Sequence, residues 1–294
     1  TANCLAFMAM GGVNLLITNP RDMEGFVKEL SKVPFSFFPG VNTLFNSLLA
    51  TPSFAKLDFS HLKGALGGGM AVQRAVAERW KEVTGSPLIE AYGLTETSPA
   101  ACINPMNVEG FNGCIGLPIS STEGGIMNDA GELLPQGEVG ELVIRGPQVM
   151  KGYWQRPEET DKVITEDGWL RTGDLGKIDE NGHLHILGRS KELIIHGGFN
   201  VYPPEVEAAL NDHPQVIQSA VIGRMKDGDE EVLAFVQIAE GDTLDAEELR
   251  AFVKDRLAGY KRPSQIIIAT ELPAAPTGKL LKHKLLDAFT DRLN

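Results

Sequence analysis

Residues 188–207, GRSKELIIHGGFNVYPPEVE, constrain the fold of this chain more than any other segment. Charged side chains lead into an apolar run long enough for one strand. Gly197 and Gly198 follow, and they can adopt backbone angles that a side chain would forbid. Tyr202 stands before two prolines, so we expect a helix that begins near Pro204. The segment predicts an elbow, a strand, a glycine loop and a helix, as at an interdomain hinge. An ordinary surface loop is the alternative.

Strand-like and helix-like stretches alternate over residues 1–95. Apolar side chains at positions 72, 76, 80 and 83 recur at helical spacing and predict a helix over residues 70–83. Such alternation favours a largely parallel sheet, whose ligands bind beyond the carboxyl ends of the strands. The loops GGGM (67–70) and YGLTETS (92–98) fall at that edge. The predicted strands cover residues 13–17, 35–38, 64–69 and 88–92.

The remaining sequence predicts two further regions, so we expect an α/β fold in three domains. Residues 113–188 are short, glycine-punctuated β-forming segments with a hairpin signal at Asn181-Gly182, which predicts antiparallel strands arranged like a small barrel. Residues 189–294 predict a small, mobile α+β C-terminal domain, with a helix capped by Asp245. The domain before these two, residues 1–112, is the parallel-type sheet subdomain.

The charge and the cysteines exclude several classes of function. The formal net charge is −12 and no run of lysine and arginine occurs, so a nucleic-acid partner is not expected. The three cysteines have no C-x-x-C spacing, which argues against a disulfide framework or a zinc site and fits a reducing, cytoplasmic compartment. No apolar run reaches transmembrane length. No Walker, G-x-G-x-x-G, G-x-S-x-G or H-E-x-x-H motif supports a P-loop NTPase, dehydrogenase, serine hydrolase or zinc protease.

Three loops carry side chains that are candidates for a chemical role. Thr95 offers a hydroxyl to a phosphate, Glu96 a hard oxygen to magnesium, and Tyr92 a flat face for stacking, although such a loop is often only a turn. Asp174 follows a glycine turn, where a carboxylate can accept both hydroxyls of a ribose; an Asx turn or a helix cap is the alternative. Lys279 lies in a Pro- and Gly-flanked loop, and a solvated surface lysine is its alternative.

Eight segments together resemble the adenylate-forming (ANL) superfamily of acyl-CoA synthetases. They keep the order of that superfamily and span nearly the whole chain. They are AYGLTE (91–96), GELVIRG (140–146), GYW (152–154), GWLRTGD (168–174), GRSKELI (188–194), GFNVYPPEVE (198–207), YKRP (260–263) and PTGK (276–279). Within the superfamily, NPRD (19–22), GVNTLFNSLL (40–49), LGGGM (66–70) and GPQVMKGYWQRP (146–157) are most similar to bacterial long-chain fatty-acid–CoA ligases.

The resemblance implies where the nucleotide base would bind. The glycine loop that flanks adenine in the superfamily falls on Gly68, Gly69 and Met70. The aromatic side chain that stacks on adenine falls on Tyr92, and Gly93 joins the nucleotide-binding loop.

Phosphate, metal and ribose contacts follow from the same resemblance. It assigns the phosphate contact to Thr95 and the magnesium ion to Glu96. It assigns the ribose to Asp174, assisted by Arg189. The implied cofactors and co-substrates are therefore ATP or AMP, Mg²⁺ and coenzyme A.

The last third of the chain would supply the moving parts. The resemblance makes Lys191 the hinge, Gly198 a lining residue of the pantetheine tunnel and Lys279 the lysine that promotes adenylation. Lys282 stands where many relatives have arginine. Lysine keeps the positive charge of that arginine but lacks its planar guanidinium group.

The resemblance implies an ATP-dependent fatty-acyl-CoA synthetase. A CoA ligase for a medium-chain or aromatic acid is the alternative, and a non-catalytic nucleotide-binding fragment is another. The serine-, threonine- and glycine-rich phosphate loop of the superfamily is absent, and we expect it upstream of Thr1 and the given chain to be nearly inactive. A homodimer and a peripheral contact at the inner face of the membrane are left open. Six side chains are candidates to line the acyl pocket, with an ordinary core as the alternative: Phe35, Phe37, Phe38, Val41, Leu44 and Phe45.

Overall fold

The computed structural model describes residues 2–275 and 279–293. The chain forms two compact units, Thr1–Ile186 and Leu187–Asn294, and each is described by itself. The three-domain division at 112/113 and 188/189 stays a prediction.

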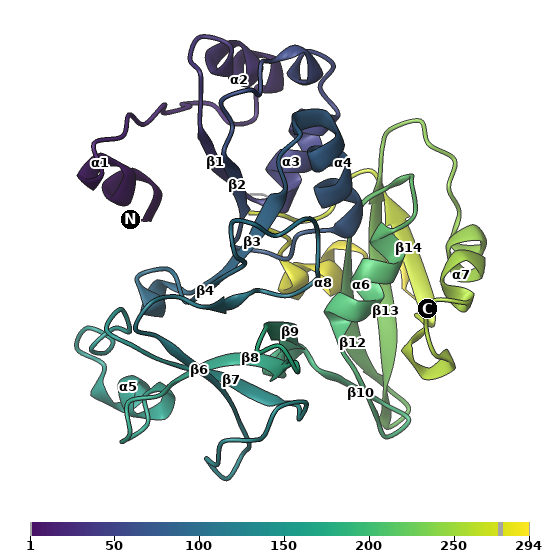
Figure 1. Cartoon of the computed structure of the whole chain (residues 1–294). Helices are drawn as coiled ribbons and strands as arrows, with labels where there is room; N and C mark the ends of the chain where they lie inside the picture. The colour runs from purple at the N-terminus through teal and green to yellow at the C-terminus, as the bar shows by residue number, and fades with distance from the viewer. Residues whose placement is uncertain (1, 276–278, 294) are drawn as a thin grey trace. The chain divides into compact units, whose positions relative to one another are not determined.

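A mixed five-stranded sheet organises the first part of unit 1, in the order β1-β2-β3-β4-β5 (Figure 1). β1 (Phe37–Gly40), β2 (Gly64–Gly67) and β3 (Leu88–Tyr92) are parallel. β4 (Cys102–Ile103) and β5 (Leu117–Pro118) then pair in the antiparallel sense. The predicted α/β class is thereby confirmed, and the loops after β2 and β3 lie at one edge of the sheet because parallel strands end together.

Helices α2 (Met23–Leu30), α3 (Asn42–Leu49) and α4 (Arg74–Thr84) enclose an aromatic core. The rings of Phe45 and Trp80 lie 4.8 Å apart between centroids, and both side chains are fully buried. Phe38 belongs to the same core, so for Phe38 and Phe45 the core alternative holds. Phe37 alternates with Phe38 along β1 and contacts Phe7 instead, at 5.1 Å between ring centroids.

The predicted strand at 13–17 is wrong. The chain starts with a π-helix, η1 (Ala2–Ala6), and a single turn, α1 (Phe7–Ala9), and then runs without regular structure. Val13 is 98% exposed. A strand is stabilised by hydrogen bonds to a neighbour, and no described strand pairs with this segment.

A second sheet has the order β6-β7-β8-β9. Its first three strands belong to unit 1, and β9 runs across the boundary between Ile186 and Leu187. Its strands are β6 (Glu123–Met127), β7 (Gly140–Arg145), β8 (Leu170–Ile178) and β9 (Leu184–Arg189), with helix α5 (Pro157–Val163) between β7 and β8. The Asn181-Gly182 hairpin is confirmed: Gly182 has a φ of +84°, and the Asp179 N–H donates to His183 O at 2.9 Å. The described strands form an open sheet rather than the expected barrel, because β6 and β9 lie at opposite ends of the order.

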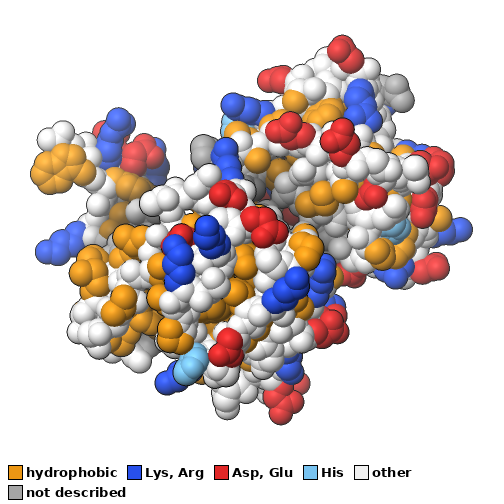
Figure 2. All heavy atoms as spheres, turned by 90° about the horizontal axis from the view of Figure 1, so that it is seen from above, with side chains coloured by type: hydrophobic (Ala, Val, Ile, Leu, Met, Phe, Trp, Pro, Cys, Tyr) orange, Lys and Arg blue, Asp and Glu red, His pale blue; other side chains and the backbone are white. Residues whose placement is uncertain are grey.

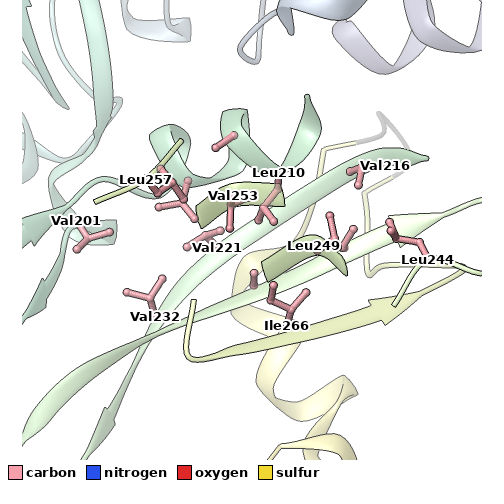
Figure 3. Packing of buried hydrophobic residues seen from close by; sticks show 14 of the residues in the cluster. Val201, Leu210, Val216, Val221, Val232, Leu244, Leu249, Val253, Leu257 and Ile266 are labelled. Atoms are coloured by element: carbon pink, nitrogen blue, oxygen red, sulfur yellow. The ribbon is translucent and has the colours of Figure 1, made fainter. Parts of the chain in front are cut away.

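Unit 2 is built on a three-stranded sheet in the order β12-β13-β14 (Figure 1). Helices α6 and α7 cover one face, where Leu210, Leu249 and Val253 meet Val221, Val232 and Ile266 (Figure 3). Leu285 of α8 packs against Phe235 on the other face. The elements are β10 (Ile194–His196), β11 (Phe199–Val201), α6 (Pro203–Asn211), β12 (Val216–Lys226), β13 (Asp229–Ile238), α7 (Ala246–Lys254), β14 (Gln265–Ala269) and α8 (Leu285–Ala288).

Several short 3₁₀ turns complete the chain. They are η2 (Phe54–Lys56), η3 (Thr95–Thr97), η4 (Ser190–Glu192), η5 (Gly259–Lys261), η6 (Lys282–Lys284) and η7 (Thr290–Arg292). Asp245 caps α7 as predicted, since its Oδ1 accepts from the Glu248 N–H at 2.8 Å. None of the helices in the described part of the chain has the length and apolar character needed to cross a membrane. On the face shown in Figure 2, basic side chains lie among acidic ones, which leaves no extended basic surface there.

Candidate functional site

The two predicted ligand loops of unit 1 lie side by side at the carboxyl edge of the sheet. Gly67 pairs with Gly40 on one side and with Glu90 on the other. The Gly68 N–H donates to Gly40 O at 3.2 Å, and a Cβ on Gly68 would lie 3.2 Å from Ala91 O. The chain that leaves β2 therefore runs close beside the end of β3.

The loop after β3 is folded tightly around a glycine. A Cβ on Gly93 would lie 1.7 Å from Pro99 O, so only glycine fits there. The buried Thr97 hydroxyl accepts from the Leu94 N–H at 2.9 Å and holds the turn of η3. This turn displays Thr95 to solvent and leaves Glu96 half-buried. Sequence reasoning missed Thr97, although it stands in the same TET triplet.

Tyr92 and Asp174 come together although they lie in different sheets. The Tyr92 hydroxyl donates to Asp174 Oδ2 at 2.5 Å. Asp174 is buried on β8, and its N–H donates to Thr172 Oγ1 at 3.1 Å. The residues proposed for adenine and for ribose are thus direct neighbours.

Glu96 has a partner that sequence reasoning did not single out. The Tyr153 hydroxyl donates to Glu96 Oε1 at 2.8 Å, and the Met150 N–H donates to Glu96 O at 2.8 Å. The hydrogen bond to the Glu96 carboxylate, together with partial burial, raises the pKa of the Tyr153 phenol. The GYW motif that contains Tyr153 was the available signal.

The oxygen chemistry around Glu96 fits magnesium. Mg²⁺ keeps several waters and commonly binds through one or two carboxylates plus substrate phosphates. In the described ranges, no group of three or more His, Cys, Asp or Glu side chains could hold a metal by itself. A single carboxylate at Glu96 suits an ion that arrives with the phosphates of a nucleotide.

Glu90 is a further residue that sequence reasoning missed. It precedes Tyr92 by two positions on β3, so both side chains lie on the same face of the sheet. Burial raises the pKa of the Glu90 carboxyl to about 7, against the lowering effects of the Gly113 N–H and of Arg74. This carboxyl is therefore partly protonated near neutral pH.

Gly69 and Met70 follow Gly68 in the loop after β2, and the remaining candidate residues belong to unit 2. Gly197 and Gly198 form the turn between β10 and β11, with φ of +58° and +79°, which favours glycine. Arg189 and Lys191 are exposed at and after the end of β9. Lys279 is exposed, and its carbonyl accepts from the Ala275 N–H at 2.8 Å; residues 276–278 of the PTGK motif lie outside the described residues.

Lys282 lies between two carboxylates of unit 2. Its Nζ is 2.7 Å from Glu192 Oε2 and 2.9 Å from Glu207 Oε1. Burial lowers the pKa of Lys282, but Glu207 and Glu192 outweigh it, so the pKa of Lys282 is raised. Burial also raises the pKa of Glu207, although Lys282 opposes it. The cluster joins η6, which follows Lys279 by three residues, to η4, which contains Lys191.

Family models and curated relatives both match the chain. Residues 1–154 match the family model described as AMP-binding enzyme, and residues 205–279 match that of the AMP-binding enzyme C-terminal domain. The chain is 47% identical over 287 residues to a long-chain-fatty-acid–CoA ligase of Escherichia coli, which covers 98% of this chain and 51% of the relative. It is 35% identical to a feruloyl-CoA synthase of an Amycolatopsis species, over 97% of this chain and 58% of the relative.

A solved structure is also similar. An anthranilate CoA ligase in complex with anthranoyl-AMP has a TM-score of 0.86 and 28% sequence identity, over 96% of this chain and 55% of the other. The chain spans about half the length of the curated relatives it matches.

Proposed function

We propose, because the chain belongs to the AMP-binding enzyme family, that the whole protein is an acid–thiol ligase that makes acyl-CoA from a long-chain fatty acid, ATP and coenzyme A. The observation that carries the proposal is the hydrogen bond from Tyr92 to Asp174. Tyr92 stands four residues before Glu96 in the YGLTETS segment. One nucleotide could meet an aromatic ring, a ribose-binding carboxylate and a magnesium-binding carboxylate at that place.

Adenylation is the first proposed step. A carboxylate oxygen of the fatty acid attacks the α-phosphorus of ATP, the bond to pyrophosphate breaks, and an acyl adenylate remains. Tyr92 and Asp174 would hold the base and the ribose, and Thr95 would hydrogen-bond the phosphates. Mg²⁺ at Glu96 would neutralise charge on the phosphates when bound. Lys279 would stabilise the charge that grows on the phosphate, and such a donor is commonly worth about 10²–10³ in rate.

Thioester formation is the second proposed step. The sulfur of coenzyme A attacks the acyl carbonyl, the bond to AMP breaks, and the thiol proton passes to solvent. Gly198 would line the channel for the pantetheine arm, since no atom of the described residues would lie within 4 Å of a Cβ at Gly197 or Gly198. Lys191 would be the pivot of a rotation that moves Lys279 away from the reacting groups and brings the Gly198 turn to them. Arg189 would assist Asp174 at the ribose.

Pyrophosphate release from the whole protein tests the substrate class. We expect release on addition of ATP and palmitate, and little with benzoate. The similarity to a feruloyl-CoA synthase and an anthranilate CoA ligase favours a ligase for an aromatic acid as the second candidate. A preference for benzoate over palmitate would replace the first proposal by the second.

The two half-reactions test the assigned roles. Lys279→Ala should lower adenylation about 10²–10³-fold and spare thioester formation from supplied acyl adenylate. Lys191→Pro should block thioester formation and leave adenylation largely intact. Equal loss of both steps in either variant would contradict the role assigned to that residue.

We also propose that residues 1–294 alone bind AMP but do not adenylate an acid. No serine-, threonine- and glycine-rich phosphate loop occurs within them. AMP titration and pyrophosphate release measured on this chain and on the whole protein would decide it. Light scattering would test whether the protein is a homodimer, and sedimentation with anionic vesicles would test for a peripheral membrane contact.

A further inference from the structure

The hairpin that carries Gly198 is too small to fix its own shape. β10 and β11 have three residues each, and His196 pairs with Phe199 beside the Gly197-Gly198 turn. An isolated two-stranded hairpin is at best marginally stable in water. The conformation of this turn therefore depends on what the hairpin is bound to.

Two neighbouring carboxylates at the start of β13 bind the backbone of the hairpin. Glu230 Oε2 accepts from the Ile195 N–H at 2.5 Å. The Asp229 carboxylate accepts from the Gly197 N–H, at 2.9 Å to Oδ2 and 3.2 Å to Oδ1. Hydrogen bonds to charged acceptors are stronger than those between neutral groups. Asp229 thus binds an amide of the turn itself.

The His196 side chain adds a third connection. Its Nδ1 lies 3.2 Å from Asp229 Oδ2 and 2.5 Å from Glu230 O. Because both neighbours are acceptors, Nδ1 carries a proton and donates. The imidazole at the end of β10 is thereby oriented by the same two residues that bind the backbone.

A tight turn places these carboxylates. Asp227 and Gly228 link β12 to β13, and their φ angles of +53° and +89° suit a two-residue hairpin turn. Asp229 follows the turn directly and pairs with Lys226.

On β11, the other strand of the small hairpin, Phe199 stacks on Tyr260 at 4.7 Å between ring centroids. The hairpin is held on both sides of its glycine turn.

We propose that Asp229 and Glu230 are positioning residues for thioester formation, which hold the Gly197-Gly198 turn in the shape that admits the pantetheine arm of coenzyme A. The proposal rests on the proposed function, in which Gly198 lines that channel. Neither residue belongs to a segment that the resemblance assigned to catalysis. Since misplacement of a positioning group by about 1 Å can cost roughly 10²-fold in rate, loss of the anchor has a measurable effect.

The experiment measures both half-reactions of the whole protein in Asp229→Ala, Asp229→Asn and Glu230→Ala. We expect adenylation to stay within about twofold of the wild type, while thioester formation from supplied acyl adenylate falls about 10–100-fold with a raised KM for coenzyme A. Asp229→Asn, which keeps an acceptor oxygen, should lose less than Asp229→Ala. Asp227→Asn is the matched control, because Asp227 is an exposed aspartate in the turn between β12 and β13. This variant should change neither step.

Hydrogen exchange over residues 194–201 provides a second readout. Exchange should be faster in Asp229→Ala and unchanged in Asp227→Asn. Thioester formation at the wild-type rate in Asp229→Ala and Glu230→Ala, or an equal loss of both steps, would overturn the positioning role. If the wild type itself catalyses neither half-reaction, it is the proposed function that fails.

Discussion

Tyr92 and Asp174, 82 positions apart in the sequence, are joined by a hydrogen bond of 2.5 Å from the phenol to the carboxylate. The contact connects the end of β3 to the middle of β8, so it joins the two sheets of unit 1 at the edge where the ligand loops lie.

Replacement of Asp174 should weaken nucleotide binding more than replacement of Tyr92. Asp174→Asn removes a charged acceptor, and we expect the Kd for AMP to rise about 10–100-fold. Tyr92→Phe keeps the flat ring and loses one donor, so the rise should be about tenfold or less. Calorimetric titration of the whole protein with AMP measures both, with exposed Asp129→Asn as the control. An unchanged Kd in Asp174→Asn would remove Asp174 from the nucleotide site.

The magnesium requirement should depend on Glu96 and little on its partner. Glu96→Gln keeps the shape and removes the charge, so half-maximal adenylation should need about tenfold more Mg²⁺ or more. Tyr153→Phe removes only the hydrogen bond to Oε1 and should shift the requirement by no more than about threefold. Pyrophosphate release against Mg²⁺ concentration separates the two variants. If both variants shift the Mg²⁺ requirement equally, the charge of Glu96 does not set that requirement by itself.

Loss of Lys282 should destabilise unit 2. Lys282→Met leaves Glu192 and Glu207 facing each other without a cation, and we expect a loss of about 2–3 kcal/mol in the free energy of unfolding. Lys282→Arg keeps the charge and should lose less than about 1 kcal/mol. Urea unfolding measures the change, and exposed Lys284→Met in the same turn is the control. Equal stabilities of the Lys282→Met and Lys284→Met variants would show that the cluster contributes nothing.

Glu90 should make stability depend on pH. A carboxyl whose folded pKa is raised from 4.5 to about 7 destabilises the fold when it ionises, so stability falls as the pH rises from about 4.5 through 7. Glu90→Gln removes this titration and should be more stable than the wild type at pH 8, by up to about 3 kcal/mol. Urea unfolding at pH 5 and pH 8 tests it, with exposed Glu82→Gln as the control. The same pH dependence in wild type and Glu90→Gln would exclude Glu90 as its source.

Local signals predicted much of the fold. The cap of α7 at Asp245, the turn at Asn181-Gly182 and the start of α6 at Pro203 each depend on a few adjacent residues, so the sequence contains them in full. Helical spacing located α4, although the helix starts at Arg74 rather than at 70 because the Gln73 N–H donates to Asn42 Oδ1 instead. Residues 13–17 have the composition of a strand but no described neighbour to pair with.

The sequence by itself determined the α/β class, the order of the motifs and the residue types at the candidate site, since periodicity, turns and caps act over short distances. Only the tertiary structure decided that Tyr153 donates to Glu96, that Lys282 lies between Glu192 and Glu207, and that Asp229 binds the Gly197 amide. These partners are far apart along the chain, and their contacts arise from strand register and loop closure. No local pattern of residues encodes them, because each depends on where two separate elements pack.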